Sequence, residues 1–270
     1  MRRTSRLSWL WLVLVGIFML APLLATLQLS LQAEMRSGVP ISLKAYVDAV
    51  SNPRGIPTFD FIGHLSFSFF AALLTIVIST LLLVPTAYWT QLKLPFLIPV
   101  MEFLTLLPIV IPVVVLVFGL ETVYRGQFLT NSTQGLYWLM IGANVVITFP
   151  YSYRPINTAL QAINVKTLTE ASQSLGAGWA NTLFAVIFPN IWVGVLNGAF
   201  ITFAIVMGEF TISSILGLPT FSVLMYSSST NQVYQPAALT IISFGITWAS
   251  IALLQFVGRR SAVADLAGAR

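Results

Sequence analysis

Residues 166–189 read KTLTEASQSLGAGWANTLFAVIFP and form, on the side of the membrane expected to be cytoplasmic, the longest polar and helix-forming connection of an otherwise apolar chain. The stretch follows the fourth of six apolar segments that are long enough to cross a membrane as helices. A polar connection between membrane segments is a place where a membrane protein can contact a soluble partner.

The composition of the chain indicates an integral membrane protein. Hydrophobic residues make up 57% of the 270 residues and charged residues 8%, whereas soluble domains carry about 25% charged residues. The mean hydropathy is +0.88. A helix needs roughly 20 apolar residues to cross a bilayer, so this length accommodates about six crossings with short loops. We expect one all-α, polytopic domain over residues 1–270. The sequence has no cysteine, which excludes disulfides and thiolate metal sites.

Six membrane spans are expected. They cover about residues 9–29, 64–90, 96–120, 136–153, 191–216 and 236–257, with a cytoplasmic loop over about 154–189. The first apolar run is too long for a signal peptide and lacks a clear cleavage site, so we expect an uncleaved span. The connection over residues 32–63 is expected to be an exposed loop. Pro108 and Pro112 should kink the third span, because proline lacks the backbone donor that a helix requires.

The basic residues predict the orientation in the membrane. Six spans place both termini on one side, and nine basic residues fall there against four on the other. The first group is Arg2, Arg3, Arg6, Lys93, Arg154, Lys166, Arg259, Arg260 and Arg270, and the second is Arg36, Lys44, Arg54 and Arg125. Cytoplasmic loops of membrane proteins carry such an excess. Both termini and the 166–189 stretch are therefore expected in the cytoplasm, and the net charge of +5 requires no nucleic-acid partner.

The local pattern of the stretch predicts two helices. Thr167 and Glu170 have the spacing of a capping box, in which the two side chains accept from each other's amides, so a helix should begin near Thr167. Its expected apolar stripe is Leu168, Ala171 and Leu175. Gly176 and Gly178 supply a stop or bend, and a second helix should follow over 179–188. On these residues alone, an ordinary amphipathic connector at the lipid surface is as plausible as a docking element.

A resemblance favours the docking element. Glu170-Ala171-Ser172, three residues, Gly176, nine residues and then Val-Ile-Phe-Pro ending at Pro189 resembles the EAA loop of permease subunits of binding-protein-dependent ABC importers. That pattern reads Glu-Ala-Ala, three residues, Gly, nine residues, Ile-x-Leu-Pro. Ser172 replaces the second alanine, and the Val-Ile-Phe run departs modestly from Ile-x-Leu.

The resemblance implies a fold and a set of partners. The fold would be the six-helix, MetI-like permease fold of type I importers, with a coupling helix that enters a groove on the ATPase. The implied coupling residues are Thr167, Glu170, Ala171, Ser172, Leu175 and Gly176. The implied partners are a second permease, a dimer of ATPase subunits, an extracytoplasmic substrate-binding protein and the lipid of the inner (plasma) membrane. The second permease is expected to be a different chain, with a homodimer left open.

No cofactor is expected in this chain. It has no Gly-x-x-x-x-Gly-Lys-Ser/Thr phosphate loop, so ATP and Mg²⁺ would be bound by the partner ATPase. Motifs of hydrolases and metalloproteases are also missing, and the lone His64 has no companions that suggest a metal site. We therefore expect a non-catalytic subunit without a metal.

A carboxylate in a membrane span needs a reason, because burying it is costly. We expect a substrate path formed by Glu209, Phe210, Thr211 and Tyr226, and an equally weighted alternative in which Glu209 is hydrogen-bonded by neighbours such as Thr211 or Ser213. Glu102 is expected to be structural. The Gly-x-x-x-Gly pair at 194 and 198 should permit close helix packing.

The substrate prediction rests on the same resemblance. The Gly-Glu-Phe-Thr context of Glu209 and the Pro-Thr-Phe run at 219–221 are most similar to spermidine/putrescine permeases, which predicts a polyamine. Phosphonate, ferric iron and thiamine are alternatives. A self-sufficient secondary carrier or channel, using Glu102 or Glu209 for ion coupling, is the hypothesis from another functional class.

Overall fold

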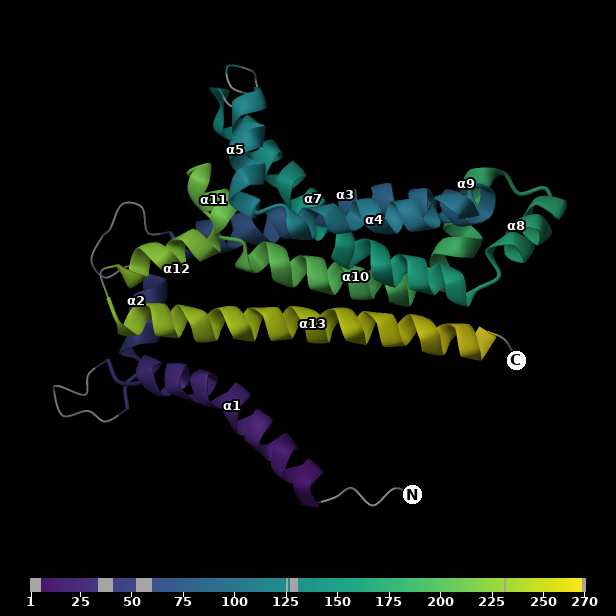
Figure 1. The fold of residues 1–270 in the computed structure, drawn as a ribbon. Helices are drawn as coiled ribbons and strands as arrows, with labels where there is room; N and C mark the ends of the chain where they lie inside the picture. Colours follow the sequence, from purple (N-terminus) through teal and green to yellow (C-terminus); the bar gives the residue numbers. More distant parts are fainter. Residues whose placement is uncertain are drawn as a thin grey trace. The chain divides into compact units, whose positions relative to one another are not determined.

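The computed structural model describes residues 6–33, 41–51, 60–124, 126, 131–230 and 232–268. All regular elements in these ranges are helices, which confirms the all-α class. The chain divides into two units, Met1–Gly63 with Leu224–Trp248 and His64–Val223 with Ala249–Arg270. Figure 1 shows the course of the chain.

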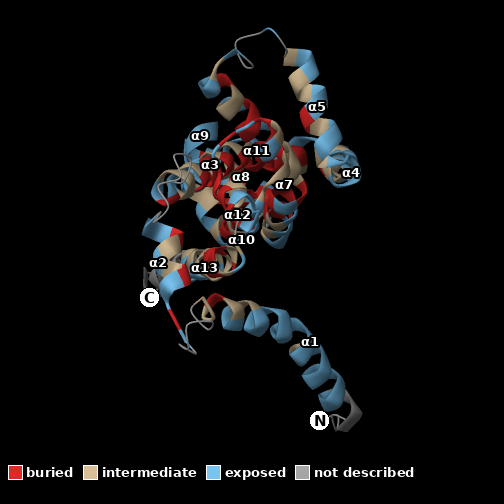
Figure 2. Ribbon diagram, turned by 90° about the vertical axis from the view of Figure 1, so that its left-hand side faces the viewer, coloured by how far each residue is buried: buried red, intermediate tan, exposed pale blue. Residues whose placement is uncertain are grey.

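The first unit contains α1 (Arg6–Ser30), α2 (Lys44–Ser51) and the N-terminal part of α13 (Tyr234–Gly268). Helix α1 is exposed along nearly its whole length (Figure 2). A hydrogen bond of 2.8 Å joins the hydroxyls of Ser30 and Tyr46, and Gln235 Nε2 donates to Asp48 O at 3.0 Å. The connection expected as a plain exposed loop therefore contains a helix, α2, whose alanines are buried.

The second unit is a set of long helices with short helices at both ends. Its elements are α3 (Phe61–Lys93), α4 (Ile98–Val110), α5 (Val113–Tyr124), α7 (Thr133–Ala162), α8 (Val165–Ser174), α9 (Trp179–Asn181), η3 (Thr182–Ile187), α10 (Phe188–Gly208) and α11 (Thr211–Ile215). Helix α3 begins three residues before the unit, and a short turn, η2 (Pro95–Leu97), precedes α4. Helices α8 and α9 lie at one end, and α5 and α11 lie at the other (Figure 1).

Helices α7 and α10 pack most closely of all, through the predicted glycine pair. A Cβ atom on Gly194 would lie 2.5 Å from Ala159 Cβ, and one on Gly198 would lie 3.2 Å from Ser152 Cα. The hydroxyls of Ser152 and Thr202 share a buried hydrogen bond of 2.7 Å across the same contact. The prediction of a packing role is confirmed, and the packing is within this chain.

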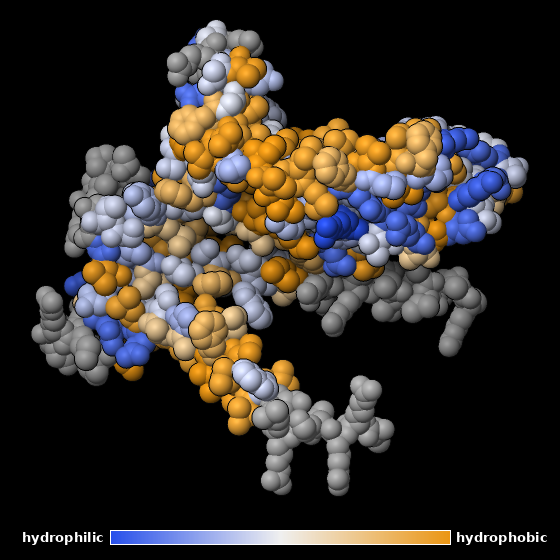
Figure 3. All heavy atoms as spheres, in the orientation of Figure 1, coloured by the Kyte–Doolittle hydropathy of each residue, from blue (hydrophilic) through white to orange (hydrophobic). Residues whose placement is uncertain are grey.

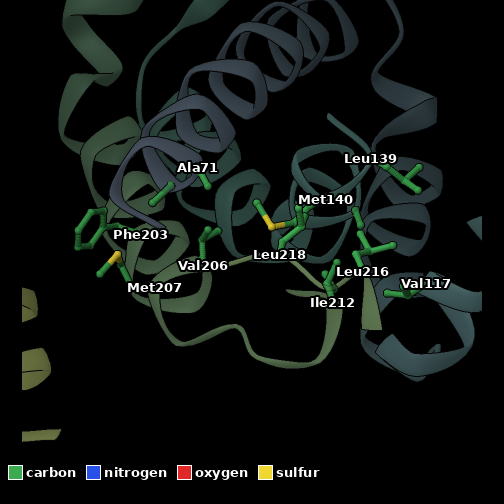
Figure 4. Packing of buried hydrophobic residues seen from close by; sticks show 12 residues of the cluster. Ala71, Val117, Leu139, Met140, Phe203, Val206, Met207, Ile212, Leu216 and Leu218 are labelled. Atoms are coloured by element: carbon green, nitrogen blue, oxygen red, sulfur yellow. The ribbon is translucent and has the colours of Figure 1, made fainter. Parts of the chain in front are cut away.

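Two apolar cores occupy the two ends of the second unit. The core near α11, shown in Figure 4, is Ala71, Ala72, Val117, Leu139, Met140, Ala143, Phe203, Val206, Met207, Ile212, Leu216 and Leu218. The core near α8 is Leu83, Val84, Ala87, Tyr88, Tyr153, Ile156, Leu160, Val165, Leu183, Ile187, Ile191 and Val195. The second core includes a residue of α8, so this helix is anchored in the bundle.

Among the described residues, four helices are long and apolar enough to cross a membrane. They are Trp9–Ser30, Phe61–Lys93, Trp179–Ile215 and Tyr234–Ala252. The pair Pro95–Val110 and Val113–Tyr124 makes a fifth candidate if it counts as one span, although it bends by 95°. The expected kink of the 96–120 segment is therefore confirmed at Pro112, whereas α4 continues through Pro108. Ile111 is extended because it precedes Pro112, which disfavours helical backbone at the preceding residue.

Helix α7, which contains the expected fourth span, does not meet the same apolar criterion. Four polar side chains in its middle part, those of Asn144, Thr148, Ser152 and Asn157, are buried. Such residues lower the hydropathy of a segment without exposing polar groups to lipid. The six-span topology stays a prediction.

The helices of the structure differ from the expected fifth span, 191–216, at both of its ends. The helical path begins earlier, at Trp179, and α10 stops at Gly208, where Glu209 is extended. Just before Pro189 the backbone widens into the π-helical turn η3, which accommodates a residue that lacks an amide donor. Asn190 Nδ2 donates to the carbonyl of Val186 at 2.7 Å.

Candidate functional site

Helix α8 lies inside the stretch that opens the sequence analysis. It begins at Val165, two residues before the expected start, because Asn164 is its N-cap and accepts from Thr167 N at 3.1 Å. The predicted capping box is therefore wrong. Glu170 instead lies one turn after Lys166, with Oε1 and Nζ 3.9 Å apart on the exposed surface. An exposed pair of this kind contributes a few tenths of a kcal/mol.

The end of α8 confirms the predicted stop at Gly176. Its φ angle is +86°, a left-handed conformation that favours glycine. The amide of Gly176 donates to Gln173 O at 2.9 Å, and that of Ala177 to Ser172 O at 3.1 Å. These two bonds form a Schellman motif, which satisfies the last carbonyls of the helix. Gly178 then caps α9 with ordinary φ, −75°.

The buried face of α8 matches the predicted apolar stripe only at Leu168, which is half-buried and packs against the second core. Val165, Thr169 and Ser172 are buried, whereas Ala171 is exposed and Leu175 is 90% exposed. Two hydroxyl residues can lie on the inner face because both have hydrogen-bond partners there, which removes the cost of their burial.

Those partners belong to two other elements. Thr169 Oγ1 lies 3.1 Å from the hydroxyl of Tyr88, which is in α3. Ser172 Oγ lies 3.1 Å from Thr182 Oγ1 in η3. Both bonds are buried, so they fix the rotation of α8 about its axis as well as its position.

The opposite side of α8 is exposed over most of its length. We define the outward face as its exposed residues together with the following leucine: Lys166, Thr167, Glu170, Ala171, Gln173, Ser174 and Leu175. Hydrophilic residues gather at this end of the unit (Figure 3). The structure thus presents five of the six predicted coupling residues, including Gly176, on the exposed side and places Ser172 inside.

The aromatic residue that begins α9 also contacts α3. The rings of Trp89 and Trp179 stack with centroids 6.0 Å apart and planes 27° apart. Nearby, Gln91 Nε2 donates to Asn157 Oδ1 at 2.8 Å, and Asn157 Nδ2 donates to Glu102 Oε1 at 3.2 Å. Glu102 thus has the structural hydrogen bond that was expected, in a polar chain that joins α3, α7 and α4.

At the other end of the unit, Glu209 caps α11. Its Oε1 accepts from Ile212 N at 2.8 Å, and its Oε2 accepts from the amide and the hydroxyl of Ser213, both at 3.3 Å. This is the arrangement that the alternative to a substrate contact describes, with Ser213 as one of the partners. The carboxylate is half-buried, as are Phe210 and Thr211.

The fourth residue of the expected substrate path lies elsewhere in the chain. Tyr226 is in α12 (Phe221–Ser229), on the part of that helix that belongs to the first unit, and it is 58% exposed. The residues around Tyr226, between the expected fifth and sixth spans, are thus helical over Phe221–Ser229. Among the described residues, no group of three or more His, Cys, Asp or Glu side chains could hold a metal ion.

Sequence reasoning missed the residues that hold α8 in place. Asn164 had a detectable signal, since asparagine is a strong N-cap. Tyr88, Trp89 and Gln91 had none, because their partners lie far away in the sequence.

Comparison with known proteins extends the resemblance. No family model matches the chain. It is 30% identical over 127 residues to the molybdenum transport system permease protein ModB of Escherichia coli K12, covering 44% of this chain and 55% of that protein. It is 32% identical over 147 residues to the probable sulfate transport system permease protein cysT of Chlorella vulgaris, covering 49% and 55%. The match to ModB of Haemophilus influenzae, 29% identical, covers 74% of that protein. The chain spans about half the length of the first two relatives.

A solved structure shows the same fold. The crystal structure of an amino acid ABC transporter with histidines matches with a TM-score of 0.53 and 20% identity, over 79% of this chain and 99% of that one. The relatives confirm the resemblance to transport-system permease proteins, and the solved structure confirms the fold alone. They do not support the narrower resemblance to spermidine/putrescine permeases.

Proposed function

We propose that the chain is a non-catalytic, membrane-spanning permease subunit of an ATP-driven, binding-protein-dependent importer. The observation that carries this proposal is the outward face of α8, which is exposed while the helix is anchored from behind by Tyr88 and Thr182. An element held rigidly on one side and exposed on the other is suited to docking. The similarity to transport-system permeases supports an ATPase as the docked partner.

The proposed assembly follows from this role. Two permeases enclose a path, and an extracytoplasmic binding protein delivers the solute to it. A dimer of ATPase subunits binds on the cytoplasmic side, with one subunit beneath α8 of each permease. ATP and Mg²⁺ bind to the ATPases. Closure of the ATPases displaces the coupling helices and opens the path outward, and hydrolysis resets the assembly. The second permease is a different chain in this proposal, and both termini are cytoplasmic.

Co-purification of the ATPase tests the proposal. Leu175→Asp places a charge at the most exposed apolar position of the outward face and should reduce ATPase retention at least about ten-fold, as buried unpaired charges do at interfaces. Glu170→Ala should weaken retention less. Gln134→Asp, an exposed substitution at the opposite end of α7, is the matched control. Equal retention by all variants, or solute flux by this chain alone in liposomes, would contradict the proposal.

For the substrate, we infer a small inorganic oxyanion of the sulfate type. The transport systems to which the relatives belong, those for molybdenum and sulfate, support this choice. The hydrogen bonds of Glu209 to the start of α11 compensate its charge, so this carboxylate no longer requires a cationic substrate. A polyamine, which the sequence favoured for the same carboxylate, is the weaker candidate.

Stimulation of ATP hydrolysis by loaded binding proteins separates the two substrates. Sulfate-loaded or molybdate-loaded binding protein should stimulate the assembled importer, and spermidine-loaded protein should not. If spermidine stimulates and Glu209→Gln removes that response alone, the polyamine is the substrate and the oxyanion inference is wrong.

A further inference from the structure

The last turn of α3 contacts three separate elements around α8. Tyr88 contacts α8 itself through Thr169, Trp89 stacks on Trp179 of α9, and Gln91 binds α7 through Asn157. These residues are nearly consecutive, so one turn of one helix holds all three contacts. The peptide chain joins α8 to α7 and to α9, but α3 is connected to α8 only through such side chains.

The direction of the buried hydrogen bond can be assigned. Thr169 Oγ1 donates to the carbonyl of Val165 at 2.7 Å, and a hydroxyl has only one hydrogen to donate. The Tyr88 hydroxyl is therefore the donor to Thr169. Tyr88 is fully buried and Thr169 is 3% exposed, so a separation of α3 from α8 would leave a buried donor without a partner, which is costly.

The polar and aromatic contacts fix the position of α3 relative to α8, which the surrounding apolar core does not. The core beneath α8 contains Val165, Leu83, Ala87 and their neighbours, and apolar contacts of this kind are not directional. A hydrogen bond and a ring stack hold only over a narrow range of positions. They therefore determine whether α3 keeps its position relative to α8 when α8 is displaced.

We propose that the last turn of α3, residues 88–91, locks α3 to α8 and α9 as one rigid group, so that a displacement of α8 moves α3 with it. The hydrogen bond from Asn157 to Glu102 carries the connection on to α4. Tyr88, Trp89 and Gln91 are positioning residues for transport in this scheme. The inference rests on the proposed function, because it names the residues through which an ATPase docked on α8 would act on the membrane helices.

The double substitution Tyr88→Phe with Thr169→Val tests the lock. It preserves the packed volume and removes both partners together, so it leaves no buried donor unpaired and thermal stability should stay near that of the parent chain. Transport per ATP hydrolysed should fall about five-fold, the factor that corresponds to the net free energy of one hydrogen bond. Thr86→Val is the matched control, since that hydroxyl binds only Leu82 O of its own helix.

The distance between spin labels on α3 and α8 gives a second measurement. A role of these residues in stability alone would not change it. The natural chain has no cysteine, so Lys93→Cys with Gln173→Cys places spin labels on the exposed ends of α3 and α8. The distance distribution should be narrow and the same with and without ATP in the assembled importer. In the Tyr88→Phe/Thr169→Val background it should broaden.

Two results would overturn the lock: a label distance that changes with nucleotide in the parent chain, or a double variant that transports as much solute per ATP as the parent. Failure of the parent chain to retain an ATPase is a different result, which refutes the proposed function. The lock is then still tested in the isolated chain, where equal distribution widths with and without the double substitution would reject it.

Discussion

Gly194 of α10 and Pro155 of α7 approach so closely that a Cβ atom on Gly194 would lie 2.7 Å from the Pro155 carbonyl oxygen. Gly194→Ala should therefore separate the two helices and lower the free energy of unfolding by about 1–3 kcal/mol, as overpacking does. Thermal unfolding in detergent measures the change.

The control for this prediction lies on the same pair of helices. Gly142 is an exposed residue of α7 with no atom within 4 Å of an added Cβ. Gly142→Ala should raise stability slightly, because alanine favours helix over glycine by about 1 kcal/mol. Equal effects of the two substitutions would contradict the proposed role of close approach.

The turn after α8 provides a second prediction. Gly176 has a φ of +86°, so Gly176→Ala should cost about 1–2 kcal/mol of left-handed strain. The strain loosens the end of α8 and should reduce ATPase retention together with stability. Gly178→Ser is the control, because that N-cap has ordinary φ and serine is a good N-cap. Retention that is insensitive to Gly176→Ala would show that the turn does not position the docking face.

Ser172 stands where the resembled family has alanine, and the structure predicts which replacements it tolerates. Thr182 Oγ1 donates to Gly178 O at 3.1 Å, so Ser172 donates to Thr182. Ser172→Ala should cost only about 0.5–1.5 kcal/mol, because Thr182 keeps its other bond. Ser172→Leu should cost more and displace α8, since the site is buried. Comparing the unfolding temperatures and ATPase retention of the two variants tests this order.

The cap formed by Glu209 predicts a graded series. Glu209→Gln keeps an acceptor but loses the charge at the start of α11, and Glu209→Ala loses both. Stability should therefore fall from Glu to Gln to Ala, with a total loss of about 0.5–2 kcal/mol. Thermal unfolding without any substrate is the measurement. If Gln and Ala leave the unfolding temperature unchanged, the cap has no role in stability and a direct role in transport becomes the better explanation.

The sequence was sufficient to predict the all-α class and the approximate position of α8, because both depend on local signals. Apolar run length indicated membrane helices, and Gly176 marked the end of α8 through a backbone conformation that glycine favours. The spacing of Gly194 and Gly198 predicted that another helix approaches α10 closely, but not that this helix is α7.

What the sequence could not predict depends on partners that are distant along the chain. The prediction of the inner face of α8 was wrong because it did not include Thr169. The burial of this residue is compensated by a hydrogen bond with Tyr88, which lies 81 residues earlier in the sequence. The kink at Pro112 was predicted, but its angle of 95° was not, because the angle depends on the packing of α4 and α5 against other helices. The role of Glu209 was left open because a carboxylate after a helix suits either a cap or a ligand, and the two differ only in geometry.

The polar interior of α7 has a consequence for how the protein reaches its membrane. On the six-span topology, this helix must pass from the translocon into the lipid. The hydrogen-bond partners that Ser152 and Asn157 have in the structure lie on other helices, α10, α3 and α4. We therefore expect α7 to insert poorly by itself and to insert well once α10 has been synthesised, a dependence that glycosylation mapping of truncated chains would detect. Membrane insertion of α7 would then depend on α10. Mutations at the Ser152–Thr202 contact would reduce the amount of protein in the membrane more than the activity of each inserted molecule.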